Sequence, residues 1–255
     1  MKVKYYLLNP TQNITVLVET PTDILLQPSV AEKLMQLEPT AEQVGFVSGE
    51  NLRMAGGEFC GNASMSAAVL LCRNLKAGES GTVHLNVSGA DGKVPVTVTA
   101  NGDGGYNGTV DMPAPIEIIS VELDYNDEKI TVPAVKFSGI THLIFEFDAE
   151  KTAIEKSVKK WCAEIGADAL GVMLLDLETS KLTPLVYVPN AGTMFWESSC
   201  ASGTSAVGAY LYSKTNSPIK YDFAEPGGTL TVEADGENLR LTGNVKIIKY
   251  SEAEI

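Results

Sequence analysis

The stretch GGEFCGNASMSAAVLL, residues 56–71, sets a cysteine between a glycine-rich approach and an apolar run that is typical of a buried helix. Cys60 therefore falls at the first turn of the predicted helix. A cysteine that serves only packing belongs deeper in such a run, where Cys72 stands. The stretch WESSCASGTSAVGAYL, residues 196–211, repeats the arrangement around Cys200. The sequence thus puts two thiols at the starts of two similar helices.

A second pair of segments supports a duplication within the chain. VTVTANGDGG at residues 96–105 follows the first helix, and LTVEADGENL at residues 230–239 follows the second. Two similar pairs in the same order favour an internal repeat over coincidence. If two such units meet face to face, we expect the N-termini of the two helices to come together, and with them Cys60 and Cys200.

The rest of the chain is predicted to form two mixed units of strands and helices. The predicted helices are Ser29–Leu37, with Ser29 as N-cap, Ala63–Leu75, Ala153–Ile165 and Gly203–Lys214. The predicted strands are Val3–Leu8, Thr15–Glu19, Gln43–Ser48, Val83–Val87, Val94–Ala100, Gly108–Met112, Ala134–Phe137, His142–Phe147, Ala169–Asp176 and Leu185–Val188, and three more close the chain. MPAPIE, residues 112–117, is interpreted as a linker between the units.

Composition excludes several classes of partner. The chain has 255 residues, of which 44% are hydrophobic and 20% charged, so a globular fold is expected. A formal net charge of −13 argues against nucleic acid or an anionic membrane surface as partner, because both select basic patches. The N-terminus lacks the apolar core of a signal peptide, and no apolar run approaches the length of a membrane span. We therefore expect a cytoplasmic protein, in which thiols stay reduced.

The sequence offers no recognisable cofactor or metal motif. The four cysteines are not a disulfide framework in a reducing compartment, and no CxxC or HxxxH spacing indicates a metal site. No GxGxxG opens a dinucleotide fold, and AEPGGTLTV lacks the lysine and hydroxyl of a phosphate-binding loop. We therefore expect neither a cofactor nor a metal.

A thiol at a helix N-terminus has a specific chemical use. The helix dipole and the free N–H groups stabilise a thiolate, so its pKa is expected to fall below the ~8.5 of a free thiol. Small residues after each cysteine leave those N–H groups open to a carboxylate. One thiolate can then remove the α-proton of an amino acid while the opposite thiol returns a proton to the other face. The pattern favours racemisation without a cofactor.

Other interpretations remain open at this stage. A single cysteine before an apolar helix is more often structural than functional. A functional role is favoured only because Cys60 and Cys200 occupy equivalent positions in two similar segments. Cys72 and Cys162 are predicted to pack in the core, His84 to be structural, and His142 to be structural rather than part of the site. A thiol–disulfide redox protein is the alternative from a different class. A metal site built from Cys60, Cys200 and a histidine is a third.

EFCGN, the later ESSCASGT and the final PGGTLTVEADG…LTG resemble the diaminopimelate epimerase superfamily over the whole chain. Within it, NPTQNITVLVE, EQVGF, GGEFCGNASMS and WESSCASGT are most similar to the histidine racemases, including the staphylopine type. The resemblance implies an α+β fold of two pseudo-symmetric domains, each a curved antiparallel sheet wrapped around a central helix. It implies domains at residues 1–114 with 245–255 and at 115–244.

The resemblance also implies roles for single residues. Cys60 and Cys200 become the acid/base pair, and the substrate-binding positions are Asn13, Gln43, Met54, Gly61, Asn62, Glu197, Ser198, Ala201 and Ser202. Diaminopimelate epimerases carry an arginine where this chain has Ser198, and amides at Met54 and Ile140. These departures favour histidine as substrate, with diaminopimelate or another amino acid as the alternative. The expected partner is thus a small amino acid, and a homodimer is compatible with the resemblance.

Overall fold

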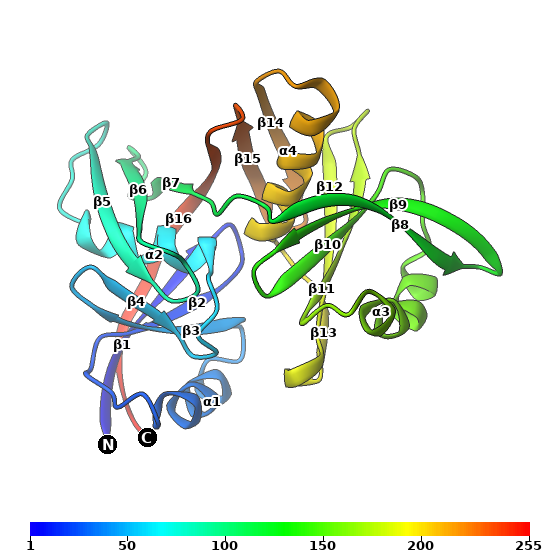
Figure 1. The fold of residues 1–255 in the computed structure, drawn as a ribbon. Helices are drawn as coiled ribbons and strands as arrows, with labels where there is room; N and C mark the ends of the chain where they lie inside the picture. Colours follow the sequence, from blue (N-terminus) through cyan, green and yellow to red (C-terminus); the bar gives the residue numbers. More distant parts are fainter. The chain divides into compact units, whose positions relative to one another are not determined.

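The chain divides into two compact units. The computed structural model describes residues 1–255, apart from the side chain of Ala191. We name Met1–Met112 with Arg240–Ile255 unit 1, and Pro113–Leu239 unit 2 (Figure 1). The resemblance puts the return to the first domain at residue 245. In the structure the returning strand already pairs Arg240 with Asp111, so the chain re-enters unit 1 at residue 240 rather than at residue 245.

Unit 1 is a closed sheet around one helix. Its strands are β1 (Lys2–Pro10), β2 (Thr15–Val18), β3 (Gln43–Ser48), β4 (Asn51–Met54), β5 (Ser80–Val87), β6 (Lys93–Ala100), β7 (Tyr106–Asp111) and β16 (Leu239–Glu254), and its helices are α1 (Gln27–Leu37) and α2 (Gly61–Leu71). The strands neighbour one another in that order, and β16 also pairs with β1, which closes the ring. α2 contacts β1, β2 and β4–β7. Since the strands surround it, α2 is buried from Gly61 to Leu70.

Unit 2 also combines a sheet with a central helix, and it is formed by one continuous segment of the chain. Its strands are β8 (Glu117–Tyr125), β9 (Glu128–Phe137), β10 (Ile140–Phe145), β11 (Leu170–Asp176), β12 (Lys181–Val188), β13 (Thr193–Trp196), β14 (Ile219–Glu225) and β15 (Gly228–Ala234); its helices are α3 (Lys151–Ile165), α4 (Ala201–Thr215) and the 3₁₀ turn η1 (Pro189–Ala191). The spatial order is β8-β9-β10-β11-β12-β14-β15, and β13 pairs with β12. α4 contacts β9–β11, β14 and β15.

The two units share their pattern of strand directions. In unit 1, β2 is parallel to β3 across α1, and β4 is parallel to β5 across α2. In unit 2, β10 is parallel to β11 across α3, and β12 is parallel to β14 across α4. The sheets are mainly antiparallel, as expected, and these four pairs are parallel because each helix is a crossover that joins two strands running in the same direction. The α+β class and the central helix of each unit are confirmed.

Small side chains allow α4 to lie deep within unit 2. A Cβ atom at Gly208 would come 2.4 Å from the Cγ2 atom of Val232 on β15. The helix and the sheet therefore approach more closely there than a side chain would allow. On the other face of the same sheet, α3 packs around the fully buried Trp161 and Phe145. The middle of the central helix is thus packed closely against the sheet at Gly208.

Several predicted elements need correction. α1 begins at Gln27 after Leu26, with Pro28 in its first turn, so Ser29 is not the N-cap; its hydroxyl donates to the Leu26 carbonyl. α2 ends at Leu71 and does not reach residue 75. Three strands were not predicted, namely β4, β8 and β13. β4 and β13 have only four residues each, which is too short for a clear periodic signal, and β8 is largely exposed and shows no clear alternation of buried side chains.

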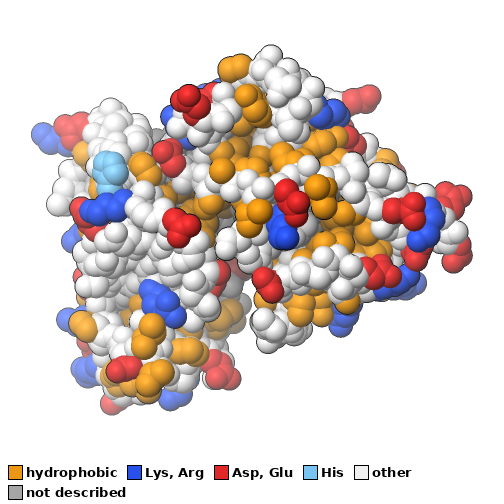
Figure 2. All heavy atoms as spheres, viewed as in Figure 1, with side chains coloured by type: hydrophobic (Ala, Val, Ile, Leu, Met, Phe, Trp, Pro, Cys, Tyr) orange, Lys and Arg blue, Asp and Glu red, His pale blue; other side chains and the backbone are white. Residues whose placement is uncertain are grey.

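The surface carries interspersed charges. Figure 2 shows acidic and basic side chains scattered among uncharged ones on the face in view. Ion pairs such as Lys2–Glu252 join exposed side chains, so solvent screens them and they add little to stability. None of the described helices is long and apolar enough to cross a membrane.

Candidate active site

Cys60 is the N-cap residue of α2. Its backbone is extended, and its sulfur accepts the N–H of Ala63 at 3.4 Å. The hydroxyl of Ser64 donates to the Cys60 carbonyl at 2.7 Å. The segment before Cys60 is held by Gly89, where a Cβ atom would come 2.3 Å from the Phe59 nitrogen. Only a glycine allows this approach, which sets Cys60 at the start of the helix.

A chain of amides fixes the polar partner of Cys60. The Gln43 amide nitrogen donates to Asn13 at 2.5 Å and to the Thr15 hydroxyl at 2.8 Å. Asn13 in turn donates to Glu42 at 2.6 Å. The Gln43 amide is thereby oriented with its oxygen toward Cys60, and the thiol donates to that oxygen at 2.9 Å. The structure thus brings Asn13, Gln43 and Cys60 together, as the resemblance implies.

The other predicted positions of unit 1, Met54, Gly61 and Asn62, are all buried. Gly61 and Asn62 form the buried first turn of α2, and the side-chain oxygen of Asn62 has no hydrogen-bond partner among the described atoms. Met54 is fully buried at the end of β4, opposite Gly45. A contact between Met54 and substrate stays a prediction.

Cys200 is the N-cap residue of α4 and repeats the arrangement in unit 2. The hydroxyl of Thr204 donates to the Cys200 carbonyl at 2.8 Å, as Ser64 does at Cys60. The Gly203 N–H faces the thiol and favours the thiolate, although it does not complete a capping hydrogen bond. A Cβ atom at Gly203 would come 2.2 Å from the sulfur of Met173. A side chain at position 203 would therefore displace the end of Met173 beside this cysteine.

The pKa of the Cys200 thiol differs from the expectation based on the sequence. Burial raises the pKa of its thiol well above the ordinary value, and the nearby carboxyl groups of Glu197 and Glu225 raise it further. The expectation that the helix N-terminus lowers this pKa is therefore wrong for Cys200. The loss of hydration for a 5% exposed sulfur outweighs the helix dipole. Cys200 is held as a thiol at neutral pH.

Glu225 was not predicted from the sequence. It ends β14, and its carboxyl accepts the backbone N–H of Cys200 at 2.8 Å and contacts the Thr204 hydroxyl. Burial raises the pKa of this carboxyl to about 8. The sequence shows only a turn after this residue, and nothing local links it to a cysteine 25 positions earlier.

His142 reaches the site through a serine. Its Nε2 atom lies 3.0 Å from the hydroxyl of Ser202, which lies 3.7 Å from the Cys200 sulfur. The ring is fully buried, and burial lowers its pKa to about 3, so it is neutral. The interpretation of His142 as a structural residue misses this connection. Its Nδ1 atom has no hydrogen-bond partner among the described atoms.

The remaining predicted positions precede or begin α4. Glu197 and Ser198 are half-buried in the segment between β13 and α4. Ser198 accepts the Gly227 N–H at 2.7 Å through its carbonyl. Ala201 is the first helical residue and is buried, so its methyl group is accommodated by ordinary helical backbone.

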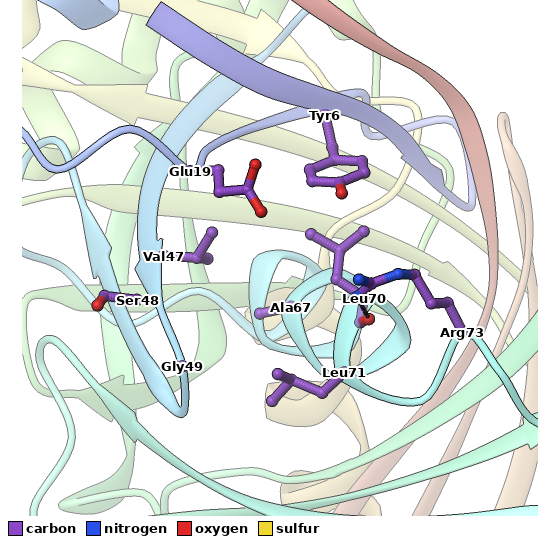
Figure 3. A pocket seen from close by; sticks show the side chains of 9 residues that line it. All are labelled: Tyr6, Glu19, Val47, Ser48, Gly49, Ala67, Leu70, Leu71 and Arg73. Atoms are coloured by element: carbon purple, nitrogen blue, oxygen red, sulfur yellow. Dashed lines mark hydrogen bonds between the residues drawn. The ribbon is translucent and has the colours of Figure 1, made fainter.

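A separate cavity lies in unit 1 near the end of α2 opposite Cys60. It has a volume of about 250 Å³, and Figure 3 shows Tyr6, Glu19 and Arg73 among the residues that line it. None of the predicted site residues lines it. Within the described part of the chain, no group of three or more histidine, cysteine or acidic residues could hold a metal ion.

Comparisons with known proteins give consistent matches. A family model described as "Histidine racemase CntK N-terminal domain" matches residues 2–252. A histidine racemase of Fusobacterium nucleatum is 34% identical over 252 residues, which cover 94% of this chain and 92% of that protein. A histidine racemase of Staphylococcus aureus is 27% identical over 97% of this chain and 96% of that protein. A solved hydroxyproline epimerase from Agrobacterium vitis, with bound trans-4-hydroxy-L-proline, has a TM-score of 0.70 at 12% identity, covering 99% of this chain and 92% of that one. The last likeness shows the fold.

Proposed function

The chain belongs to the histidine racemase family and is an isomerase that acts on amino acids, and from this premise we propose that it interconverts L- and D-histidine through Cys60 and Cys200. One observation carries the choice of these two groups. Each is the N-cap of the central helix in one of two units with the same topology, and each has a hydroxyl four residues later on its own carbonyl.

The chemistry follows from the ends of the two helices. Free N–H groups at a helix N-terminus bind an anion, so they hold the substrate carboxylate and stabilise the negative charge that develops when the α-proton leaves. One sulfur removes this proton as a thiolate. The other sulfur delivers a proton to the opposite face of the α-carbon as a thiol. The result is inversion at the α-carbon, and the two groups exchange their protonation states.

The surroundings of the cysteines favour one starting assignment. Burial and two carboxyl groups favour the thiol form of Cys200, so it starts as the acid. The Cys60 thiol donates its proton to Gln43 in the structure, so Cys60 acts as the base only after it has lost that proton, and the Ala63 N–H then stabilises the negative charge on its sulfur. In the opposite direction the roles exchange, because the reverse reaction passes through the same transition state.

The residues at the positions that the resemblance assigns to substrate recognition favour histidine over diaminopimelate. A second carboxylate would need a cation, and this chain has Ser198 where diaminopimelate epimerases carry an arginine. Leaving a charged group unpaired in a closed site costs several kcal/mol. Met54 and Ile140 are apolar where those enzymes carry amides, which suits a flat and mostly neutral imidazole.

Chiral analysis of products from a panel of L-amino acids and diaminopimelate tests the proposal. We expect histidine to be racemised with kcat/KM at least about a hundredfold above that for diaminopimelate. The same incubation in deuterated water must introduce deuterium at the α-carbon. A thiol–disulfide redox protein would leave the α-proton in place. Preference for diaminopimelate would show that the role given to Ser198 is wrong.

The catalytic cysteines are tested by single substitutions. Cys60→Ser and Cys200→Ser should each lower histidine racemisation by about a thousandfold or more, because a hydroxyl is a far weaker acid than a thiol. Cys72→Ser is the matched control: this half-buried thiol follows the last turn of α2 and should leave kcat unchanged. Near-normal racemisation by either catalytic variant would refute the two-base mechanism.

A cytoplasmic location also belongs to this proposal. The four cysteines are free in the structure. A mechanism that needs a thiol and a thiolate works only where both stay reduced. Activity should therefore fall on mild oxidation and return on treatment with a dithiol reductant.

A further inference from the structure

Glu225 is buried against both peptide groups of Cys200. One carboxyl oxygen accepts the Cys200 N–H at 2.8 Å. The other contacts the Thr204 hydroxyl, which is also 2.8 Å from the Cys200 carbonyl oxygen. The carboxyl is 7% exposed, and no ion pair joins it to a lysine, arginine or histidine anywhere in the described chain. A charge at Glu225 would therefore be both desolvated and uncompensated.

One placement of the hydrogen atoms satisfies the hydrogen-bonding groups of Thr204, Glu225 and the Cys200 peptide. The Thr204 hydroxyl has one hydrogen and lies between two oxygens, those of Cys200 and Glu225. The equivalent hydroxyl in unit 1, that of Ser64, gives its hydrogen to the Cys60 carbonyl. If Thr204 does the same, the hydrogen between Thr204 and Glu225 must come from the carboxyl group. Glu225 is then a carboxylic acid that donates to Thr204 and accepts from Cys200.

We propose that Glu225 is a positioning residue for Cys200, which it holds from both sides while it is a neutral carboxylic acid, and that loss of its proton disables this half of the site. Its effect on the reaction rests on the proposed function. Loss of the proton adds a negative charge beside the thiol and turns the Thr204 hydrogen away from the Cys200 carbonyl. Both changes oppose formation of the Cys200 thiolate that the cycle requires.

The charged groups around Glu225 support a neutral resting form. Glu197 lies before α4 and adds like charge, while Lys181 on β12 pairs through its backbone with Ala224 and is itself exposed. Burial is the largest influence and raises the pKa of Glu225 to about 8. The proton is thus kept at neutral pH and lost in mildly alkaline solution.

Glu225→Gln mimics the neutral carboxylic acid at this position and cannot become negatively charged. The amide oxygen can accept the Cys200 N–H, and the amide nitrogen can donate to Thr204, without any ionisation. Glu38→Gln is the matched control. Glu38 is also 7% exposed, but it is paired with Lys249 and Tyr5 in unit 1, and contacts with these two groups lower its pKa against the opposing effect of burial.

Infrared difference spectroscopy between pH 6 and pH 9.5 tests the protonation state without substrate. We expect wild type to show the C=O stretch of a carboxylic acid that disappears with a midpoint near the pKa of about 8. The band should be absent in Glu225→Gln and retained in Glu38→Gln. Thr204→Val should shift its midpoint, which keeps the test decisive if Glu225→Gln does not fold. A wild-type spectrum without this band would overturn the proposal.

The effect on the reaction is measured as the ratio of kcat/KM for Glu225→Gln to that of wild type. Groups that titrate in the same way in both proteins change both values of kcat/KM equally, so their effects cancel in this ratio. We expect it to lie within about threefold of unity at pH 7 and to rise about tenfold by pH 9, as wild type alone loses its proton. A constant ratio would overturn the positioning role. If wild type does not racemise histidine at all, the proposed function fails, while the infrared test still decides the state of Glu225.

Discussion

Cys60 and Cys200 hold the same position at the start of a helix, yet their surroundings differ. The Cys60 thiol is half-buried and donates to an amide oxygen that Asn13 and Thr15 orient through Gln43. The Cys200 thiol is buried near two carboxyl groups that raise its pKa. The two thiols therefore differ in their surroundings: a neutral amide faces Cys60, whereas burial and two carboxyl groups oppose ionisation of Cys200.

His142 should make the protein sensitive to acid. Its pKa is about 3 in the folded protein against 6.5 for an ordinary histidine, so the unfolded chain binds the proton more readily between those values. The free energy of unfolding should therefore fall by about 1.4 kcal/mol per pH unit as the pH drops below 6.5. In His142→Gln this contribution disappears, and the pH dependence of urea unfolding becomes flatter.

His84 provides the control for this measurement. It is the other histidine of the chain and is exposed on β5. His84→Gln should keep the slope of wild type between pH 6.5 and pH 4. Equal slopes for His142→Gln and wild type would show that His142 is not buried in its neutral form.

The two central helices depend on small residues where they meet the sheet. In α4, Gly203 and Gly208 sit where a methyl group would clash with Met173 and Val232. In an ordinary helix interior, alanine is more stable than glycine by about 1 kcal/mol. Here the close packing reverses that preference, and the first turn of the helix is held in one position relative to the sheet.

Gly203→Ala should therefore impair both stability and activity. The new Cβ atom would lie 2.2 Å from the Met173 sulfur and 3.2 Å from the Cys200 sulfur. Overpacking of this kind costs about 1–3 kcal/mol. We expect a lower Tm and at least about a tenfold loss in kcat/KM, because a small displacement of Cys200 spoils proton transfer. Ser213→Ala, at an exposed position of the same helix, should change neither. An active, stable Gly203→Ala protein would contradict the close packing.

The two units are built from the chain in different ways. Unit 2 is a continuous segment, whereas unit 1 needs both ends of the chain. β16 pairs with β7 through Arg240–Val245 and with β1 along the rest of its length. The ring of strands around α2 is therefore closed by the last residues of the protein.

Deletion of residues 246–255 should open unit 1. The deletion leaves β1 with an unpaired edge and exposes the side chains that it buries, such as Val3 and Tyr5. We expect limited proteolysis to cut within unit 1 first, together with loss of racemisation. Lys2→Gln, which breaks only the exposed ion pair with Glu252, should behave as wild type. A truncated protein that resists protease and retains activity would show that β16 is dispensable.

Patterns that are local in the chain predicted much of this protein. The apolar runs after Cys60 and Cys200 predict buried helices, because side chains on every face of such a helix avoid water. The repeat of two segments in the same order predicts two similar units. β8 escaped prediction because it forms an exposed hairpin with β9, and its charged side chains hide the alternation of a strand.

The two helices, the position of a thiol at the start of each and the family of the chain could all be inferred from the amino-acid sequence. Capping and periodicity depend on neighbouring residues, so they are visible along the chain. The protonation state of Cys200 could not be inferred in this way, because it depends on packing. Burial and the approach of Glu225 arise where β14 returns beside α4, and desolvation of a charge depends on everything packed around it rather than on the residues next to it.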